Sequence, residues 1–566
     1  MSVLDRIERL RNVMEQQKID CYIIPTDDYH HSEYVGDYFK FREYITGFTG
    51  SAGTAVFTKD KAGLWTDGRY FIQAEAQLKG SGITLYKSGE SDVPTIEEFL
   101  KSELKEGDVL GFDGRTVTYA QGKRYCHIAD ENGASLKYSL DFAQNIWKER
   151  PEMSMESVFS LADEYTGEKI GSKLEQIREI MKENGCNAHV LSSLDDIAWL
   201  LNIRGNDIAY CPLVLSYAIV YNNSVELFAD IRKFSDDIIN LLAENQVKIY
   251  PYEDIYRKVS EMTSEDKLLL DSSIMNYSLY QAISKETVIV DKQNPEILMK
   301  SVKNETQAEN LRKAHLKDAV AHTKFMYWLK KNIGRVEITE LSASARLEGL
   351  RAEQEHFLGP SFGPISAYGE HGAIVHYSAD EKSNVPLKEG KLFMTDTGGH
   401  YLEGSTDITR TVALGEVGNI EKEHFTLVAR AMLRLANTVF LYGCSGANLD
   451  CISREVFWKE GLNFNHGTGH GVGYLLNIHE GPINFRWKEG ERPAPALEEN
   501  MVITDEPGIY IEGSHGIRLE NELLVRKTVK NEYGQFMNFE ILTYVPIDLD
   551  AILPEKMSTE EKEMLN

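Results

Sequence analysis

The chain contains an internal duplication. Residues 6–24 (RIERLRNVMEQQKIDCYII) match residues 173–191 (KLEQIREIMKENGCNAHVL) position for position without a gap. In both copies, apolar residues recur at helical spacing and then run into a short apolar stretch, which predicts a helix followed by a strand. Residues 63–71 and 226–234 form a second matching pair, and each predicts a strand that enters a helix. Alternating helices and strands favour a layered α/β architecture, so we expect two related α/β units.

Chain length requires more than these two units. A single hydrophobic core rarely grows beyond about 250–300 residues, and the chain has 566. A third region begins near residue 301 with a predicted long amphipathic helix over residues 304–333, which has an apolar face. We therefore predict three domains, over residues 1–155, 156–300 and 301–566. The expected fold class is α/β for the two N-terminal domains and α+β for the third.

Charge and hydropathy exclude several classes of partner. The formal net charge is −27, and such a field repels a nucleic acid backbone unless a basic patch offsets it. We expect no membrane span because no apolar run reaches about 18 residues. The first residues lack the apolar core of a signal peptide. Scattered cysteines without a CxxC pair are typical of reduced thiols, so we expect a cytoplasmic protein.

Histidines and carboxylates concentrate in the third region. Nine of the fifteen histidines lie between His356 and His515. Residues 391–414 predict two strands joined by a glycine-rich turn, and these strands carry Asp396 and Asp407. Two carboxylates delivered side by side into a partly buried site repel each other unless a cation holds them. Two exposed turn aspartates remain the alternative interpretation.

Residues 465–482 (NHGTGHGVGYLLNIHEGP) form the second chemical segment. His466, His470 and His479 lie within it, interleaved with glycines that let a backbone approach another group closely. Any one of these could be an ordinary core histidine. Three such histidines in one glycine-rich segment favour a functional site.

Two further apolar runs end in carboxylates. The run 500–511 predicts a strand that stops just past Glu506, because Pro507 cannot donate to a ladder. In residues 515–526, a single alternating strand would place Arg518, Glu520 and Glu522 on one face. A solvated sheet face is the alternative for this alternation.

The order of these segments resembles a known family. D(x)10D, HGTGHGVG, DEPGIY and GIRLEN follow one another as they do in the pita-bread metallopeptidases. The whole layout resembles the long, three-domain form of aminopeptidase P, the Xaa-Pro aminopeptidases, over nearly the entire chain. Residues 360–377 (PSFGPISAYGEHGAIVHY) and the HEGP motif also fit that subfamily. The resemblance implies two creatinase-like α/β domains followed by a pita-bread catalytic domain.

Carried over residue by residue, the resemblance implies two sets of site residues. The metal ligands of a dinuclear centre are expected to be Asp396, Asp407, His470, Glu506 and Glu520. The residues expected to serve catalysis are His376, His466, His479, Glu506 and Arg518. In this scheme Glu506 is both a ligand and a proton acceptor, and Arg518 orients a ligating carboxylate.

The implied reaction is hydrolysis of the bond between an N-terminal residue and a following proline. A hydroxide bridging two divalent ions would be the nucleophile. Four carboxylates carry about the charge that two divalent ions neutralise, and oxygen-rich ligation favours hard ions. We therefore expect Mn²⁺, with Co²⁺, Zn²⁺ or Fe²⁺ as alternatives. The expected partners are peptides with proline in the second position and, by resemblance, a second copy of the chain in a homodimer.

Three alternatives share this fold. Prolidase cuts only Xaa-Pro dipeptides. It has a single N-terminal domain, whereas two are predicted here. Methionine aminopeptidase has the same ligand set without the two preceding domains. A catalytically dead pita-bread binding protein would be expected to have lost ligands, whereas all five positions are filled here.

Overall fold

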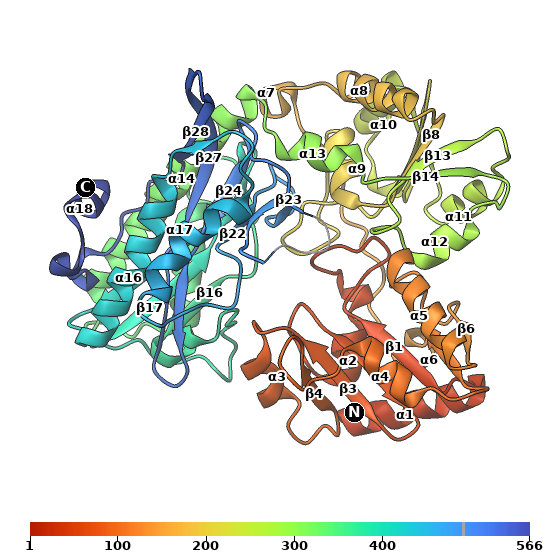
Figure 1. Ribbon diagram of the computed structural model, residues 1–566, viewed down its shortest axis with the longest axis horizontal. Helices are drawn as coiled ribbons and strands as arrows, with labels where there is room; N and C mark the ends of the chain where they lie inside the picture. Colours follow the sequence, from red (N-terminus) through yellow and green to blue (C-terminus); the bar gives the residue numbers. More distant parts are fainter. Residues whose placement is uncertain (489–492, 566) are drawn as a thin grey trace. The chain divides into compact units, whose positions relative to one another are not determined.

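The computed structural model describes residues 1–488 and 493–565, and the chain divides into two units (Figure 1). The first unit consists of Met1–Ser160 and Glu168–Glu296. The second consists of Leu161–Gly167 and the residues from Ile297 onward. Both predicted N-terminal α/β folds lie in the first unit. The boundaries predicted near residues 155 and 300 stay predictions.

The first half of the N-terminal unit is built on a six-stranded sheet in the order β4-β3-β2-β1-β5-β6. Its strands are β1 (Cys21–Pro25), β2 (Thr54–Thr58), β3 (Ala62–Thr66), β4 (Thr84–Lys87), β5 (Val109–Phe112) and β6 (Ser135–Lys137). Its helices are α1 (Val3–Gln17), α2 (Phe41–Thr46), α3 (Phe71–Gln77), α4 (Ile96–Glu103), α5 (Tyr119–Glu131) and α6 (Ala143–Ile146).

The second half repeats this plan, with a six-stranded sheet in the order β12-β11-β10-β8-β13-β14. Its strands are β8 (Ala188–Leu191), β10 (Tyr217–Tyr221), β11 (Val225–Phe228), β12 (Val247–Tyr250), β13 (Lys267–Leu270) and β14 (Val288–Asp291). Its helices are α8 (Ile170–Glu183), α9 (Leu194–Leu200), α10 (Asp236–Glu244), α11 (Asp254–Ser260) and α12 (Tyr277–Ala282). The short strands β7 (Phe159–Ser160) and β9 (Ile203–Arg204) pair with each other.

The two sheets confirm the duplication found in the sequence. In each, the strand that follows the repeated helix (β1 or β8) pairs antiparallel with one neighbour and parallel with the other. The outermost pairs on both sides are parallel in both sheets. The matching helices α1 and α8 bury their apolar faces, including Leu10 in one copy and Ile177 in the other.

The second unit contains antiparallel sheets of the pita-bread fold, covered by helices. Its strands are β15 (Phe357–Pro360), β16 (Ile365–Tyr368), β17 (Lys391–Thr397), β18 (Gly399–Tyr401), β19 (Gly404–Ser405), β20 (Ile408–Leu414), β21 (Phe440–Leu441), β22 (Gly469–Gly471), β23 (Glu480–Phe485), β24 (Val502–Asp505), β25 (Gly508–Ile511), β26 (His515–Arg518), β27 (Asn521–Asn531) and β28 (Gly534–Ile541). Its helices are α7 (Asp163–Thr166), α14 (Glu305–Asn332), α15 (Glu340–Ala352), α16 (Asn419–Ala436), α17 (Gly446–Trp458) and α18 (Thr559–Leu565), and α13 (Pro295–Ser301) precedes α14.

Two strand groups of this unit carry the site. One is the three-stranded sheet β16-β17-β20, and the other is the six-stranded sheet β21-β28-β27-β24-β22-β23. Helices α14 and α15 cover the first, where Phe325 and Leu347 pack with Phe393 and Val412. Helix α16 packs on the hairpin β25-β26. The packed helices fix the strand ends at which the chemical residues lie.

Helix α14 confirms the helix predicted over residues 304–333. Asn304 caps it, since its side chain accepts from the Gln307 amide and Gln307 bonds back to the Asn304 amide. The buried face, however, is not simply apolar. His315, Asp318 and His322 are all fully buried on it.

The single strand predicted over residues 515–526 is two strands. Strand β26 ends at Arg518 and β27 begins at Asn521, and they belong to different sheets. All the residues from His515 to Val525 are buried, so the solvated-face alternative is wrong. The break lets Arg518, Glu520 and Glu522 contact three different neighbours.

Two expectations concern the chain as a whole. Among residues 1–488 and 493–565, no helix combines the length and the apolar character needed to cross a bilayer. All six cysteines are free thiols. Cys21, Cys186 and Cys211 are buried, Cys126 and Cys444 are partly buried, and Cys451 is exposed.

Gly469 allows strands β22 and β24 to approach closely. A Cβ at this position would lie 1.8 Å from the Thr504 carbonyl oxygen. We expect Gly469→Ala to lower the free energy of unfolding by about 3 kcal/mol, because a backbone carbonyl cannot rotate away as a side chain can. Guanidinium denaturation followed by circular dichroism would measure this loss.

Gly349→Ala is the matched control. Gly349 is an exposed residue of α15, and a Cβ there would meet no atom within 4 Å. We expect this variant to be as stable as the wild type or slightly more stable, because alanine favours the helix. Equal stability of Gly469→Ala and the wild type would contradict the close approach.

Candidate metal centre

The structure brings the five predicted ligands to one place. The described part of the chain contains three groups of three side chains that could bind a metal ion. Within each group, the donor atoms lie within 4.8 Å of one another. They are Asp396 with Asp407 and Glu520, His470 with Glu506 and Glu520, and Asp407 with His470 and His479. The groups overlap, so they describe one centre. His479 was predicted to lie outside the ligand set, but its donor atom is within 4.8 Å of those of Asp407 and His470.

Asp396 and Asp407 come from neighbouring antiparallel strands. Asp396 lies on β17 opposite Thr409 of β20, and Asp407 directly precedes β20. The Arg518 guanidinium donates to Asp396 Oδ2 through Nε, at 3.2 Å, and through Nη2. Asp396 Oδ1 is buried without a hydrogen-bond partner. A buried, unpaired carboxylate oxygen is unfavourable in the protein alone and fits a cation ligand.

His470 points its Nε2 atom at the carboxylates. This atom lies 3.5 Å from Asp407 Oδ2 and 3.7 Å from Glu506 Oε1. The other ring nitrogen, Nδ1, lies 2.9 Å from the Gly471 carbonyl oxygen, to which it can donate. This contact favours the tautomer that leaves Nε2 as a lone-pair donor. The backbone amide of His470 donates to Thr504 Oγ1, which anchors β22 on β24.

The carboxylates of this centre repel one another in a buried environment. Burial and the charges of Asp396 and Glu506 raise the pKa of Asp407 well above its ordinary value. Burial and the same kind of repulsion raise the pKa of Glu520 well above its ordinary value. Burial also raises the pKa of Glu506, although His470 and Arg518 oppose the shift. Divalent cations offset such repulsion, so the donor set fits a metal centre.

A chain of hydrogen bonds runs from Asp396 toward His466. Arg518 Nη1 donates to the Tyr510 hydroxyl oxygen at 2.7 Å, and that hydroxyl lies 2.8 Å from His466 Nε2. Arg518 is 2 % exposed, and its charge is held by these carboxylate and tyrosine neighbours, which raise its pKa. Tyr510 lies inside the DEPGIY motif, but the sequence assigned it no role.

His479 packs against a candidate ligand, and His376 adjoins a residue that contacts Arg518. The His479 ring packs edge-on against the His470 ring, with centroids 4.2 Å apart. His376 is partly buried and follows Val375, whose carbonyl oxygen accepts from Arg518 Nη2 at 3.3 Å. The catalytic roles expected of His479 and His376 stay predictions.

Two further residues that support the ligands received no role from the sequence. Thr409 donates its hydroxyl to Glu520 Oε2 at 2.8 Å. Glu522 Oε1 accepts from the Asp407 backbone amide at 2.6 Å. The alternation of residues 515–526 pointed to Glu522, but only the fold shows that it contacts Asp407.

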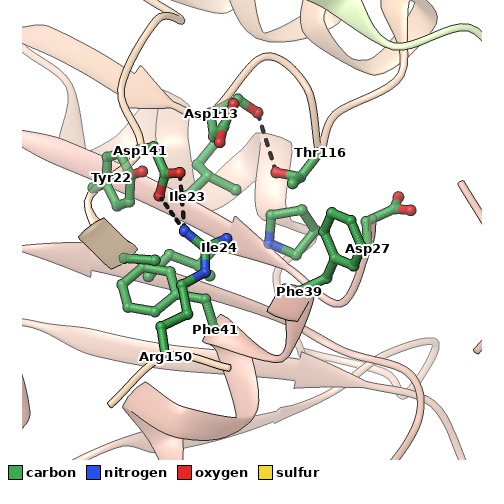
Figure 2. Close-up of a pocket in the computed structure, with 12 residues that line it drawn as sticks. Tyr22, Ile23, Ile24, Asp27, Phe39, Phe41, Asp113, Thr116, Asp141 and Arg150 are labelled. Atoms are coloured by element: carbon green, nitrogen blue, oxygen red, sulfur yellow. Dashed lines mark hydrogen bonds and ion pairs between the residues drawn. The ribbon is translucent and has the colours of Figure 1, made fainter. Parts of the chain in front are cut away.

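A small cavity in the first unit is not a second centre of this kind (Figure 2). It measures ≈ 30 Å³, about the room of one or two waters. The carboxylates that line it already have cationic partners. Asp141 contacts Arg150 at 3.0 Å, Asp113 contacts Arg115 at 2.7 Å, and Asp27 contacts His31 at 2.5 Å.

Three successive parts of the chain match known protein families. Residues 6–137 and residues 149–307 each match a Creatinase/Prolidase N-terminal domain. Residues 309–527 match metallopeptidase family M24. The M24 segment contains all five candidate ligands.

Individual proteins match over the full length. A probable Xaa-Pro aminopeptidase P of Sordaria macrospora is 37% identical, over 100% of this chain and 95% of its own. Xaa-Pro aminopeptidase 1 of Dictyostelium discoideum is 36% identical, over 100% of this chain and 92% of its own. The crystal structure of X-prolyl aminopeptidase from Caenorhabditis elegans, described as a cytosolic enzyme with a di-nuclear active site, is 34% identical. It covers 99% of this chain and 94% of its own, with a TM-score of 0.94.

We expect metal binding at this centre to release protons. The raised pKa values of Asp407, Glu506 and Glu520 mean that these carboxyls hold protons at a pH where free carboxyls do not. Before metal is added, they favour the folded state at low pH, and this contribution is lost as the pH rises through their folded-state pKa values. Added Mn²⁺ displaces the remaining protons, and more of them at pH 6 than at pH 8.

Titration calorimetry in buffers of different ionisation enthalpy measures this proton release. Asp407→Asn removes one titrating ligand, so fewer protons should be released per ion bound. A binding heat that does not depend on the buffer would contradict the expectation.

Proposed function

The chain belongs to the Xaa-Pro aminopeptidase P group of metallopeptidase family M24, and from that premise we propose how its metal centre performs the reaction. The enzyme is a metallo-exopeptidase that releases an N-terminal residue preceding proline. Two observations together support this function. The chain matches X-prolyl aminopeptidases over its full length, and five side chains of metal-binding types lie at one centre.

We assign Asp396, Asp407, His470, Glu506 and Glu520 as the ligands of two divalent ions. Their four carboxylates balance about four positive charges, and the orphaned Asp396 Oδ1 supports a cation at that position. Oxygen ligands with one imidazole favour Mn²⁺, with Co²⁺, Zn²⁺ or Fe²⁺ able to fit the same set. When bound, such ions polarise the scissile carbonyl and lower the pKa of water toward 7.

The remaining roles belong to the chain's own side chains. Glu506 accepts the proton of the attacking water and passes it to the leaving nitrogen. His479 and His376 donate hydrogen bonds to the developing oxyanion and to the substrate backbone. Arg518 holds Asp396 in orientation, and the Tyr510 hydroxyl ties Arg518 to His466.

The substrate and setting follow from the relatives. The substrates are peptides with proline in the second position, where the scissile nitrogen carries no hydrogen. We place the enzyme in the cytosol, as the nematode relative is a cytosolic enzyme. We also propose a homodimer, and domains over residues 1–155, 156–300 and 301–566. The family matches at residues 6–137, 149–307 and 309–527 support this division.

Peptides of graded length separate this function from that of a prolidase. We expect the Mn²⁺-loaded enzyme to release the first residue from Xaa-Pro-Pro and from longer peptides, because an aminopeptidase tolerates chain beyond the proline. Chromatography of the products measures the release. Cleavage of Xaa-Pro dipeptides alone would identify a prolidase, and no release with Mn²⁺, Co²⁺ or Zn²⁺ would refute the proposal.

His479→Ala separates catalysis from metal binding. We expect kcat to fall by about 100–1,000-fold, because a donor to the developing oxyanion is lost. Metal analysis should still find two ions per chain. His127→Ala is the control, since that histidine is exposed and lies in the first unit, where its Nε2 atom is 3.2 Å from Glu131 Oε1. Loss of an ion from His479→Ala would instead make His479 a ligand, as its place beside Asp407 and His470 allows.

A further inference from the structure

Helix α14 presents a buried polar face within the catalytic unit. His315, Asp318 and His322 are spaced three and four residues apart, so they share one side of the helix. All three are fully buried. Buried charge is unfavourable unless it is paired, and a hydrophobic replacement is often as stable. Stability alone therefore does not account for the charged residues on this face.

Asp318 accepts hydrogen bonds from three side chains outside helix α14. Its carboxylate forms an ion pair with Arg351 of α15, through Nε at 2.5 Å and Nη2 at 3.1 Å. It also accepts from the Tyr401 hydroxyl at 3.1 Å and from the Thr406 hydroxyl at 3.0 Å. Arg351 is 3 % exposed. Four donors thus converge on one carboxylate that touches no candidate ligand directly.

The partners of this ion pair flank the two aspartate ligands. Arg351 Nη2 donates to the carbonyl oxygen of Thr397, the residue after Asp396, at 3.2 Å. Thr406, which donates to Asp318, is the residue before Asp407. The ion pair therefore holds both ends of the segment that separates the two ligands.

The segment between the ligands has little freedom to adjust. Its short strands β18 and β19 pair with each other, and the Gly399 amide donates to Thr406 Oγ1 at 2.9 Å. At Gly398, a Cβ would lie 1.8 Å from the Thr406 carbonyl oxygen. A shift of Thr397 or Thr406 would therefore be passed on to Asp396 or Asp407.

The same helix face reaches Asp407 by a second route. Glu522 accepts from the Asp407 amide, and its other oxygen lies 3.1 Å from His315 Nε2. Both His315 and Glu522 are fully buried. Behind the backbone around Asp407 there thus lie the hydrogen bond from Thr406 to Asp318 and the close contact of His315 with Glu522.

We propose that the buried Asp318–Arg351 ion pair is a positioning device that sets the placement of Asp396 and Asp407 and thereby the metal affinity of the centre. The inference rests on the proposed ligand set. Groups that orient metal ligands from behind change metal affinity by about 10–100-fold when they are removed. Asp318 and Arg351 would act through Thr397 and Thr406, without contact with substrate.

Asp318→Asn tests the proposal because it removes the charge at nearly constant shape. We expect Mn²⁺ to bind the folded variant about 10–100-fold more weakly, since asparagine cannot accept from all four donors. Titration calorimetry measures the dissociation constant, at a temperature where circular dichroism shows a fully folded chain. Equilibrium dialysis counts the ions bound.

Glu561→Gln is the matched control in the same unit. Glu561 lies on helix α18 and is 2 % exposed. It forms ion pairs with Arg430 and Arg434 of α16. Neutralising it also breaks a buried ion pair on a helix, and the side-chain partners of Glu561 in the described structure, Arg430, Arg434 and Ser558, do not lie on the strands that carry the ligands. We expect its Mn²⁺ affinity to equal that of the wild type.

Wild-type Mn²⁺ affinity in Asp318→Asn, with only a loss of stability, would overturn the proposal. Should that variant fail to fold, Thr406→Val removes a single hydroxyl at nearly constant shape and should also weaken Mn²⁺ binding; an unchanged dissociation constant would again overturn the proposal. Asp396→Asn serves as the reference. If it retains both ions, the assigned ligand set fails, and the fault lies in the proposed function rather than in the positioning role.

Discussion

Repulsion among buried carboxylates is the constraint on which the catalytic unit depends. Asp396, Asp407, Glu506 and Glu520 place their oxygens within one small centre, where burial and mutual charge raise the pKa values of Asp407, Glu506 and Glu520. Such a cluster is unfavourable without cations. The surrounding structure must therefore hold the ligands in place while the ions supply the compensating charge.

The supporting residues meet this requirement from several directions. Arg518 provides a fixed positive charge at Asp396, and Thr409 orients Glu520. Glycine at position 469 brings His470 onto the strand that leads to Glu506. Helix α14 holds the segment between the two aspartates from behind. Each support acts on a strand end, where a small shift moves a ligand directly.

The N-terminal unit differs from the catalytic unit in that partly buried carboxylates there are paired with side chains of the protein. Its two sheets share strand order and pairing direction, and the carboxylates around its small cavity are already paired with arginine or histidine. Packing alone explains these elements, which is why periodicity predicted them well. The duplication was visible because helix α1 and helix α8 bury the same positions of the repeat.

The sequence by itself determined the repeated α/β elements, the long helix after residue 304 and the types and order of the five candidate ligands. These features follow from local periodicity and from motifs a few residues long. Only the tertiary structure showed the break between Arg518 and Asn521, the Tyr510 link to His466, and the burial of Asp318 beside Thr406. Most such contacts join residues far apart in the chain, and no local pattern encodes which distant side chain will complete a buried hydrogen bond.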